Sequence, residues 1–302
     1  MIKRFFVYIK SHGLQLAFQK AVLKILGLAG VKEEIETLHY YLNMYHDASS
    51  APPTKDPDLR IMQLCDIELL RIVTNECNKL GLTYWLTYGT LLGAVRHKDF
   101  IPWDDDLDIA MPRQDYNRAM SVLKDNLEAK GFSFEVSSRI GIGYNHRNTG
   151  LWLDIFAVDE YKTDKNYEEA YNSLKISIPK FRKKFESSKN VSIQWIENEK
   201  HKIIGGQTGH NKFLYLNPEF QYKVMVHPTE FIYPLSEVKF GEYFFNAPRD
   251  TDSYLRNTYG ENYMGFPPRG ILHHELGRGP LSTWAKKQGV DMKIVLETLK
   301  AM

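Results

Sequence analysis

The sequence predicts an α+β domain in which helices flank a mixed sheet. Segments with the alternation of strands and segments with the period of helices follow one another along residues 56–302, but without the strict alternation of a doubly wound sheet. With 302 residues, 43% of them apolar, the chain is long enough to bury a sizeable core. We therefore expect one large domain at residues 56–302, with additions near its C-terminal end, preceded by a helical extension and linker at residues 1–55.

The N-terminal extension combines apolar and basic residues. Residues 1–30 contain five lysine or arginine side chains and no acidic one, and their charges interrupt each apolar run before the ~18 residues of a spanning helix. One helical face is apolar, and it would rest on a membrane surface or pack on the domain core or another subunit. Both alternatives stay open. Because no secretory signal is evident, we expect a cytoplasmic protein, with peripheral contact to the inner membrane face under the first alternative.

The charge balance excludes one class of partner. The formal net charge is only +2, from 39 basic and 37 acidic side chains, whereas a dedicated nucleic-acid binder normally shows a strongly basic stripe. An anionic small molecule remains compatible, since a local basic pocket suffices to bind it. No Cys/His spacing indicates a zinc site. We therefore expect a small-molecule partner and no nucleic acid.

The predicted elements follow in order. Residues 59–80 have the apolar stripe of an amphipathic helix that stops at Gly81. Aromatic and β-branched residues predict a strand at 82–88, a turn at Gly89-Thr90 and a short helix at 91–97. A strand is expected at 104–111, a helix at 114–130, a strand at 132–137, and a hairpin-like pair at 140–146 and 151–158 with its turn at 148–150. Further helices are expected at 166–187, 191–204, 251–259 and 281–300, and alternation returns at 231–245.

Four aspartates within five residues are the most informative feature. On an extended strand, alternate side chains share a face, so Asp104, Asp106 and Asp108 project together and Asp105 points away. Carboxylates that close repel one another unless a cation bridges them. Oxygen ligands suit Mg²⁺ or Mn²⁺, which usually bind one or two carboxylates together with substrate phosphates. The alternative is an acidic surface loop or a fortuitous calcium site.

A lone acid interrupts a later strand. Asp154 lies in the otherwise apolar run of residues 151–158, where a carboxylate must be paired, hydrogen-bonded or bound to metal. If this strand neighbours the first one, Asp154 completes the metal cluster or acts as a general base. The alternative is a structural aspartate paired with an arginine or lysine.

Several residues are candidates for binding phosphate. Gly89 and Thr90 precede a predicted helix, whose start offers unpaired N–H groups and the positive end of its dipole. Arg96 and Lys98 follow as candidate charge partners for phosphate, although each alone is more often a solvated surface charge. His273, in a stretch rich in Pro and Gly, is a candidate contact to phosphate or acceptor, and a structural or surface histidine is an equal alternative.

Three motifs together resemble one known family. Residues 88–109 read YGTLLGAVRHKDFIPWDDDLDI and resemble the motif of the LicD family, which includes fukutin-like proteins. Residues 154–156 resemble its second acidic motif, and Tyr254-Leu255, Tyr259-Gly260, Pro267-Pro268 and His273-His274 resemble its closing motif. The resemblance spans roughly residues 60–275. It implies a nucleotidyltransferase-like core in which the Gly-Thr segment and the Asp-x-Asp strand hold metal and donor phosphates.

The resemblance also implies an activity. Family members transfer phosphocholine or a polyol phosphate from CDP-choline or CDP-ribitol to a hydroxyl of a cell-surface glycan or its lipid-linked precursor, and they release CMP. On that pattern Asp106 and Asp108 are the main ligands of Mg²⁺ or Mn²⁺, Asp104 assists, and Asp154 is a third ligand or the base. Two alternatives stay open, namely a glycosyltransferase that uses an Asp-x-Asp metal site and a nucleotide-sugar, and a non-catalytic glycan-binding relative.

Overall fold

The computed structural model describes residues 54, 56–189, 191–219, 223–265 and 282–302. Residues 52–302 form one compact unit, and the fold below is that of the described part of this unit. The predicted extension and linker, the membrane contact through residues 1–30 and the role of His273 therefore lie outside the described residues. Within the described residues, no helix combines the length and apolar character needed to cross a bilayer.

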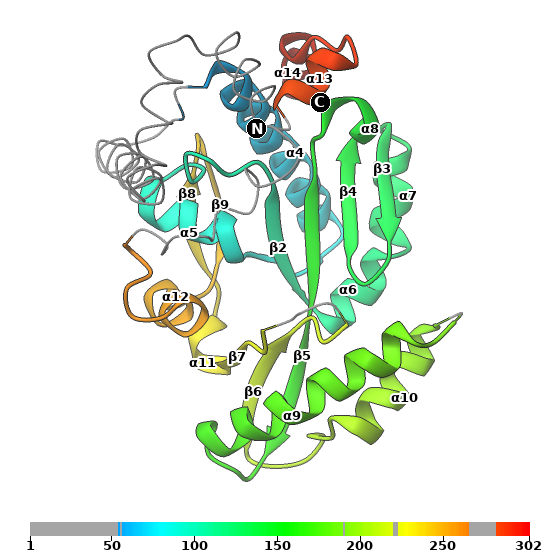
Figure 1. The fold of residues 1–302 in the computed structure, drawn as a ribbon, viewed down its shortest axis with the longest axis vertical. Coiled ribbons are helices and arrows are strands. Elements are labelled where there is room, and N and C mark those ends of the chain that lie inside the picture. The colour runs from blue at the N-terminus through cyan, green and yellow to red at the C-terminus, as the bar shows by residue number, and fades with distance from the viewer. Residues whose placement is uncertain (1–53, 55, 190, 220–222, 266–281) are drawn as a thin grey trace, which may run out of the picture. The chain divides into compact units, whose positions relative to one another are not determined.

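A curved, mixed sheet forms the centre of this unit (Figure 1). In the described residues its central strands run in the order β1 (Trp85–Leu86), β2 (Leu107–Pro112), β5 (Leu153–Thr163), β4 (Ile140–Tyr144) and β3 (Phe132–Val136). The β2 and β5 strands are parallel, and the other neighbours are antiparallel. The long β5 strand continues beyond the end of β2, and this second part pairs with β6 (Asn211–Leu216), which in turn pairs with β7 (Val226–Pro228). The mixed α+β class is therefore confirmed.

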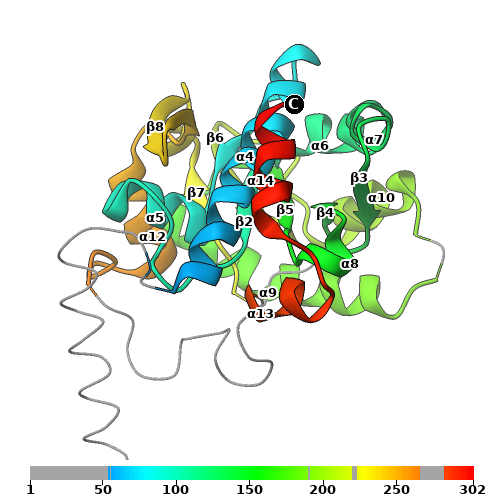
Figure 2. The same cartoon turned by 90° about the horizontal axis from the view of Figure 1, so that it is seen from above.

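Helices surround the sheet in separate groups. The long α4 helix (Pro57–Lys79) packs beside the C-terminal α14 helix (Met292–Lys300), as Figure 2 shows. The α9 (Tyr167–Glu186) and α10 (Ile193–Ile203) helices pack on each other and share a second apolar core with β6. The remaining elements are α5 (Tyr88–His97), α6 (Arg113–Ala119), α7 (Val122–Glu128), α8 (His146–Thr149), α11 (Thr229–Ile232), β8 (Ser236–Phe240), β9 (Tyr243–Ala247), α12 (Thr251–Tyr259) and α13 (Ser282–Lys287).

The α4 helix forms where its sequence predicts it. The Asp56 side chain accepts hydrogen bonds from the backbone N–H groups of Asp58 and Leu59, and Pro57 occupies the first helical position. The helix ends before Gly81, whose φ of +63° a glycine adopts without strain. Its buried stripe packs into the main core.

Several predicted segments differ from the structure. The strand expected at 82–88 is only Trp85–Leu86, because the α5 helix already begins at Tyr88 and so includes Gly89 and Thr90. The helix expected at 114–130 is broken into α6 and α7, where the Ser121 hydroxyl donates to the Arg118 carbonyl and competes with the helical pattern. The final helix, expected at 281–300, is likewise two helices, α13 and α14. The β6 and β7 strands were not predicted.

A buried stack supports the start of α5. The ring of His227 lies parallel to the ring of Tyr254, with centroids 4.0 Å apart, and Asn257 lies 3.2 Å from the His227 Nδ1. The Tyr254 hydroxyl shares a 2.8 Å hydrogen bond with the Thr87 hydroxyl. Thr87 is the residue from which α5 begins. The stack therefore fixes the position of this helix start.

This stack predicts an acid-sensitive stability. Burial lowers the pKa of His227 to about 3, whereas a histidine in the unfolded chain titrates near ~6.5. The folded state keeps the ring neutral, so this stability is present above about pH 6.5 and is lost as the pH falls toward about 3. His227→Phe keeps an aromatic ring that cannot titrate. The free energy of unfolding in urea should fall less steeply between pH 6 and 4 in His227→Phe than in the wild type. We expect the two slopes to differ by up to about 1.4 kcal/mol per pH unit. Equal slopes for the wild type and this variant, with exposed His201→Phe as the control, would contradict the assignment.

Candidate active site

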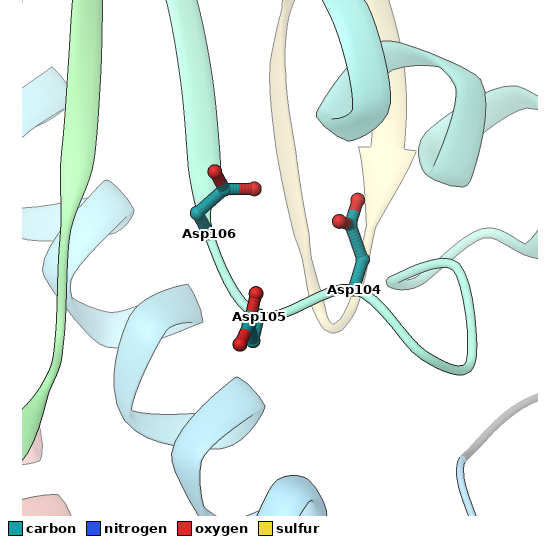
Figure 3. Close-up of side chains that lie close together, drawn as sticks. All are labelled: Asp104, Asp105 and Asp106. Atoms are coloured by element: carbon teal, nitrogen blue, oxygen red, sulfur yellow. The ribbon is translucent and has the colours of Figure 1, made fainter. Parts of the chain in front are cut away.

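The acidic segment is a loop that leads into a strand. The β2 strand begins at Leu107, whose N–H bonds the Trp152 carbonyl, so Asp104, Asp105 and Asp106 precede it. One carboxylate oxygen of each of these three residues lies within 4.8 Å of the others, and Figure 3 shows them along this loop. The strand expected at 104–111 therefore begins only at Leu107, and Asp105 is buried whereas Asp104 and Asp106 are partly exposed. Side-chain alternation applies only to paired strand, and pairing starts one residue after Asp106.

Contacts from α4 hold this loop. The Gln63 side chain donates to the Asp104 carbonyl at 2.9 Å, and the guanidinium of Arg60 makes two 2.9 Å contacts with the Asp99 carboxylate. Gln63 is fully buried. The loop is thus anchored through its backbone, which leaves the orientation of the carboxylates to the surrounding elements.

Two further aspartates lie side by side on the parallel strands. Asp108 on β2 and Asp154 on β5 are register partners, so their side chains point to the same face of the sheet. The Asp108 N–H donates to the Thr90 hydroxyl at 2.8 Å, which ties this position to the first turn of α5. The structure therefore brings together the neighbouring strands on which the sequence analysis placed the two acidic motifs.

Gly89 lets the start of α5 approach the carboxylates. A Cβ atom at this position would lie 2.7 Å from Asp104 Oδ2 and 3.8 Å from Asp108 Oδ2. Real Cβ atoms do not approach an oxygen at the shorter distance, so only glycine fits without displacing Asp104. The first turn of α5 thus lies close to Asp104 and Asp108, and the unpaired N–H groups of a helix start favour an anion such as phosphate.

This close approach gives a prediction for Gly89→Ala. The added methyl group would push the Asp104 carboxylate out of the centre. We expect transfer activity to fall by about 10²-fold, the usual effect of losing one well-placed electrostatic group. Gly81→Ala, just after the end of α4, meets no atom within 4 Å and serves as the control, although its positive φ is expected to lower stability slightly. Turnover of Gly89→Ala equal to the wild type would show that Asp104 tolerates displacement.

Asp154 has partners on both carboxylate oxygens. The indole Nε1–H of Trp152 donates to Oδ1 at 2.7 Å, and Arg139 Nε lies 2.5 Å from Oδ2. Gly141, opposite Asp154 on β4, makes room for this indole, since a Cβ there would lie 1.9 Å from the Trp152 ring. The arginine pairing left open as the alternative for Asp154 is therefore present.

The acids raise one another's pKa. Burial, and then the charge of Asp106, raise the pKa of both Asp104 and Asp108 well above their usual range. Burial also raises the pKa of Asp154, while Arg139 lowers it. A buried group of carboxylates is costly unless cations compensate it. Oxygen ligands of this kind suit Mg²⁺ or Mn²⁺. Among the described residues, the acids whose oxygens all lie within 4.8 Å of one another are Asp104, Asp105 and Asp106, and Asp108 lies outside this group.

The predicted basic residues differ in their placement. The charge of Arg96 acts on Asp104, and its guanidinium donates to the carbonyl of Gly265 at 2.9 Å. Lys98 lies at the opposite end of α5 from Gly89, with its Nζ 3.3 Å from the carbonyl of Val95. The structure therefore brings Arg96 to the centre and does not bring Lys98 there.

Sequence reasoning missed other residues of this centre. Tyr259 ends α12 with 44% of its surface exposed, and the charges of Asp108 and Asp104 contribute to raising the pKa of its phenol. Asp66 on α4 is fully buried near the acidic loop, and the backbone of Trp152 is a hydrogen-bonding neighbour of its carboxylate. Asp66 follows Met62 by four residues and precedes Leu69 by three. An acid on the apolar stripe of the α4 helix was the signal in the sequence that could have identified Asp66.

A separate polar pocket of about 600 Å³ lies near the far ends of β2 and β5. Arg113 contacts Asp159 at 2.7 Å and Glu219 at 2.8 Å, and Lys200 on α10 contacts Asp159 at 2.5 Å. These buried charges pair with one another and join α10 to β5. None of the predicted site residues that the structure describes lines this pocket, so it is distinct from the acidic centre.

An acidic centre between a helix start and two parallel strands of a mixed sheet is typical of proteins that bind phosphates together with a metal ion. The model of the LicD family, described as the LicD/FKTN/FKRP nucleotidyltransferase domain, matches residues 81–250. This match covers more than half of the 302 residues, and the chain belongs to the LicD family.

Curated relatives show how far the similarity extends. The lipopolysaccharide cholinephosphotransferase LicD of Haemophilus influenzae is 29% identical over 195 residues, which cover 58% of this chain and 72% of that protein. The uncharacterized protein RP689 of Rickettsia prowazekii is 27% identical over 64% of this chain and 53% of its own length. The human ribitol 5-phosphate transferase FKRP is 46% identical over 48 residues, which are 16% of this chain and 10% of that protein. The chain thus spans about half of the rickettsial relative and a tenth of the human one.

Proposed function

We propose that this protein is a metal-dependent transferase. It moves phosphocholine or a polyol phosphate from a CDP-activated donor to a hydroxyl of a cell-surface glycan or its lipid-linked precursor, and it releases CMP. The convergence of the Asp104–Asp106 loop with Asp108 at the start of α5 carries this proposal. Family membership and the names of the Haemophilus and human relatives support it. The CDP donor rests on the family resemblance.

Each part of the centre has a task in this reaction. Mg²⁺ or Mn²⁺, bound by Asp104, Asp106 and Asp108, would neutralise charge on the donor pyrophosphate and on the departing CMP. The first turn of α5 directs its N–H groups toward the donor phosphates, and Arg96 adds positive charge beside Asp104. These groups are fixed before the donor binds, so little reorganisation is needed during transfer.

Nucleotide release identifies the donor. The full chain is incubated with Mg²⁺ and with CDP-choline, CDP-ribitol or a UDP-sugar, each with and without a lipopolysaccharide or teichoic acid acceptor. We expect CMP from one of the CDP donors, with faster release when the acceptor is present. Release of UDP or UMP would instead support a nucleotide-sugar-dependent glycosyltransferase. Release of no nucleotide under any condition would favour a non-catalytic glycan-binding protein and reject the proposal.

A further inference from the structure

An arginine lies inside the acidic centre and occupies one of its carboxylates. Arg139 Nε is 2.5 Å from Asp154 Oδ2, and the indole N–H of Trp152 holds Oδ1 at 2.7 Å. Asp154 is nearly buried, whereas the Arg139 side chain is 27% exposed. The carboxylate is therefore the fixed member of the pair, and the guanidinium is the member that a ligand can reach.

The β4 strand builds this arrangement. Arg139 immediately precedes β4, and Gly141 on β4 is the register partner of Asp154. The Trp152 ring lies over the bare backbone of Gly141, where a Cβ atom would come within 1.9 Å of it. Packing against β4 therefore fixes the indole that orients Asp154, and Asp154 in turn orients Arg139.

The position of the pair decides which cations the centre can take. Asp108 and Asp154 face the same side of two neighbouring parallel strands, and such facing carboxylates are candidates for holding a second divalent ion, ~4 Å from the first. A second ion on Asp154 would lie against the guanidinium and be repelled by it. The positive charge that a second ion would supply is already present in Arg139.

We propose that Arg139 takes the place of a second divalent cation and contacts the phosphoryl group being transferred. A single ion then binds at Asp104, Asp106 and Asp108, and Asp154 is a positioning residue that acts through Arg139. A guanidinium has five donors in a planar fork that matches phosphate oxygens. This inference rests on the proposed transfer. The acceptor oxygen forms its bond to phosphorus as the bond to CMP breaks, CMP leaves with that electron pair, and the acceptor proton passes to water.

Counting bound Mn²⁺ tests the inference without any donor. The signal of free Mn²⁺ in electron paramagnetic resonance, followed during titration of the full chain, gives the number of bound ions. We expect one ion for the wild type and for Arg139→Lys, which keeps the charge, and two ions for Arg139→Gln. Arg118→Gln is the matched control, because Arg118 lies on α6, which follows the far end of β2, and pairs with Asp115. It should bind one ion.

Turnover supplies a second readout. We expect Arg139→Gln to lose about 10²-fold in kcat, with partial recovery at high Mn²⁺, and Arg139→Lys to lose about tenfold because an ammonium lacks the planar fork. If Arg139→Gln does not fold, Trp152→Phe replaces it in the test, because it keeps a packed ring but removes the N–H that orients Asp154. For Trp152→Phe we expect a lower kcat and one bound ion. Two ions in the wild type, or one ion with normal turnover in Arg139→Gln, would overturn the inference. A chain that releases no CMP would reject the proposed function, while the ion count would still decide the role of Arg139.

Discussion

Asp108→Asn is expected to lower kcat by about 10³-fold and, at the same time, to stabilise the metal-free protein. The loss follows from removing a ligand of the ion that neutralises the donor pyrophosphate, an effect of several kcal/mol on the barrier. Asp106→Asn should have a similar effect on turnover, because its carboxylate lies with those of Asp104 and Asp105. Transfer of phosphocholine or ribitol phosphate at saturating Mg²⁺ measures both variants.

The gain in stability has a separate cause. Burial and the neighbouring acids raise the pKa of Asp108 in the folded state, so its contribution to stability is present at low pH and is lost as the pH rises through the folded-state pKa. An asparagine cannot ionise, so the stabilisation by Asp108→Asn should be larger at pH 8 than at pH 5. Thermal melts with a metal chelator at both pH values measure it. Normal turnover, or a lower melting temperature at pH 8 than the wild type, would contradict the assignment.

Asp154→Asn is expected to reduce kcat by about 10²-fold, with a smaller effect on stability than Asp108→Asn. The Arg139 guanidinium would lose the carboxylate that it contacts at 2.5 Å. Burial raises the pKa of Asp154 while Arg139 lowers it, so the two contributions to stability oppose each other and the net change in stability should be small. Chemical unfolding and the transfer assay measure the two effects.

A surface acid provides the control for this variant. Glu160 is about half exposed and pairs with Lys162 and Lys212, so Glu160→Gln should change stability by less than about 1 kcal/mol. Its turnover should equal that of the wild type. A mild effect of Asp154→Asn on turnover would leave Asp154 with a purely structural role.

The sequence predicts the parts of this fold that depend on local pattern. The apolar stripe of α4, its stop at Gly81 and the pairing of two acid-bearing strands each follow from periodicity or from a carboxylate in an apolar run. The boundary of β2 does not, because the four aspartates have no local feature that separates loop from strand. Pairing with the segment around Trp152 fixes this boundary, and that segment is distant in the sequence.

Long-range contacts also explain what was missed in the centre. Arg139 has no neighbouring motif, and its pairing with Asp154 depends on β4 lying beside β5. Gly141 is one glycine among 20 in the chain, and its importance appears only when the Trp152 ring lies over it. Lys98 is close to the acidic motif in sequence, but α5 carries it away from the carboxylates.

The central claim is that these carboxylates bind a divalent ion that holds a pyrophosphate. An anomalous difference map from crystals of the full chain grown with Mn²⁺ and CDP tests it most directly. We predict a manganese peak about 2.1 Å from carboxylate oxygens of Asp106 and Asp108, with the CDP phosphates beside it and facing the start of α5. A map in which CDP is bound but no manganese lies at these aspartates would contradict the account.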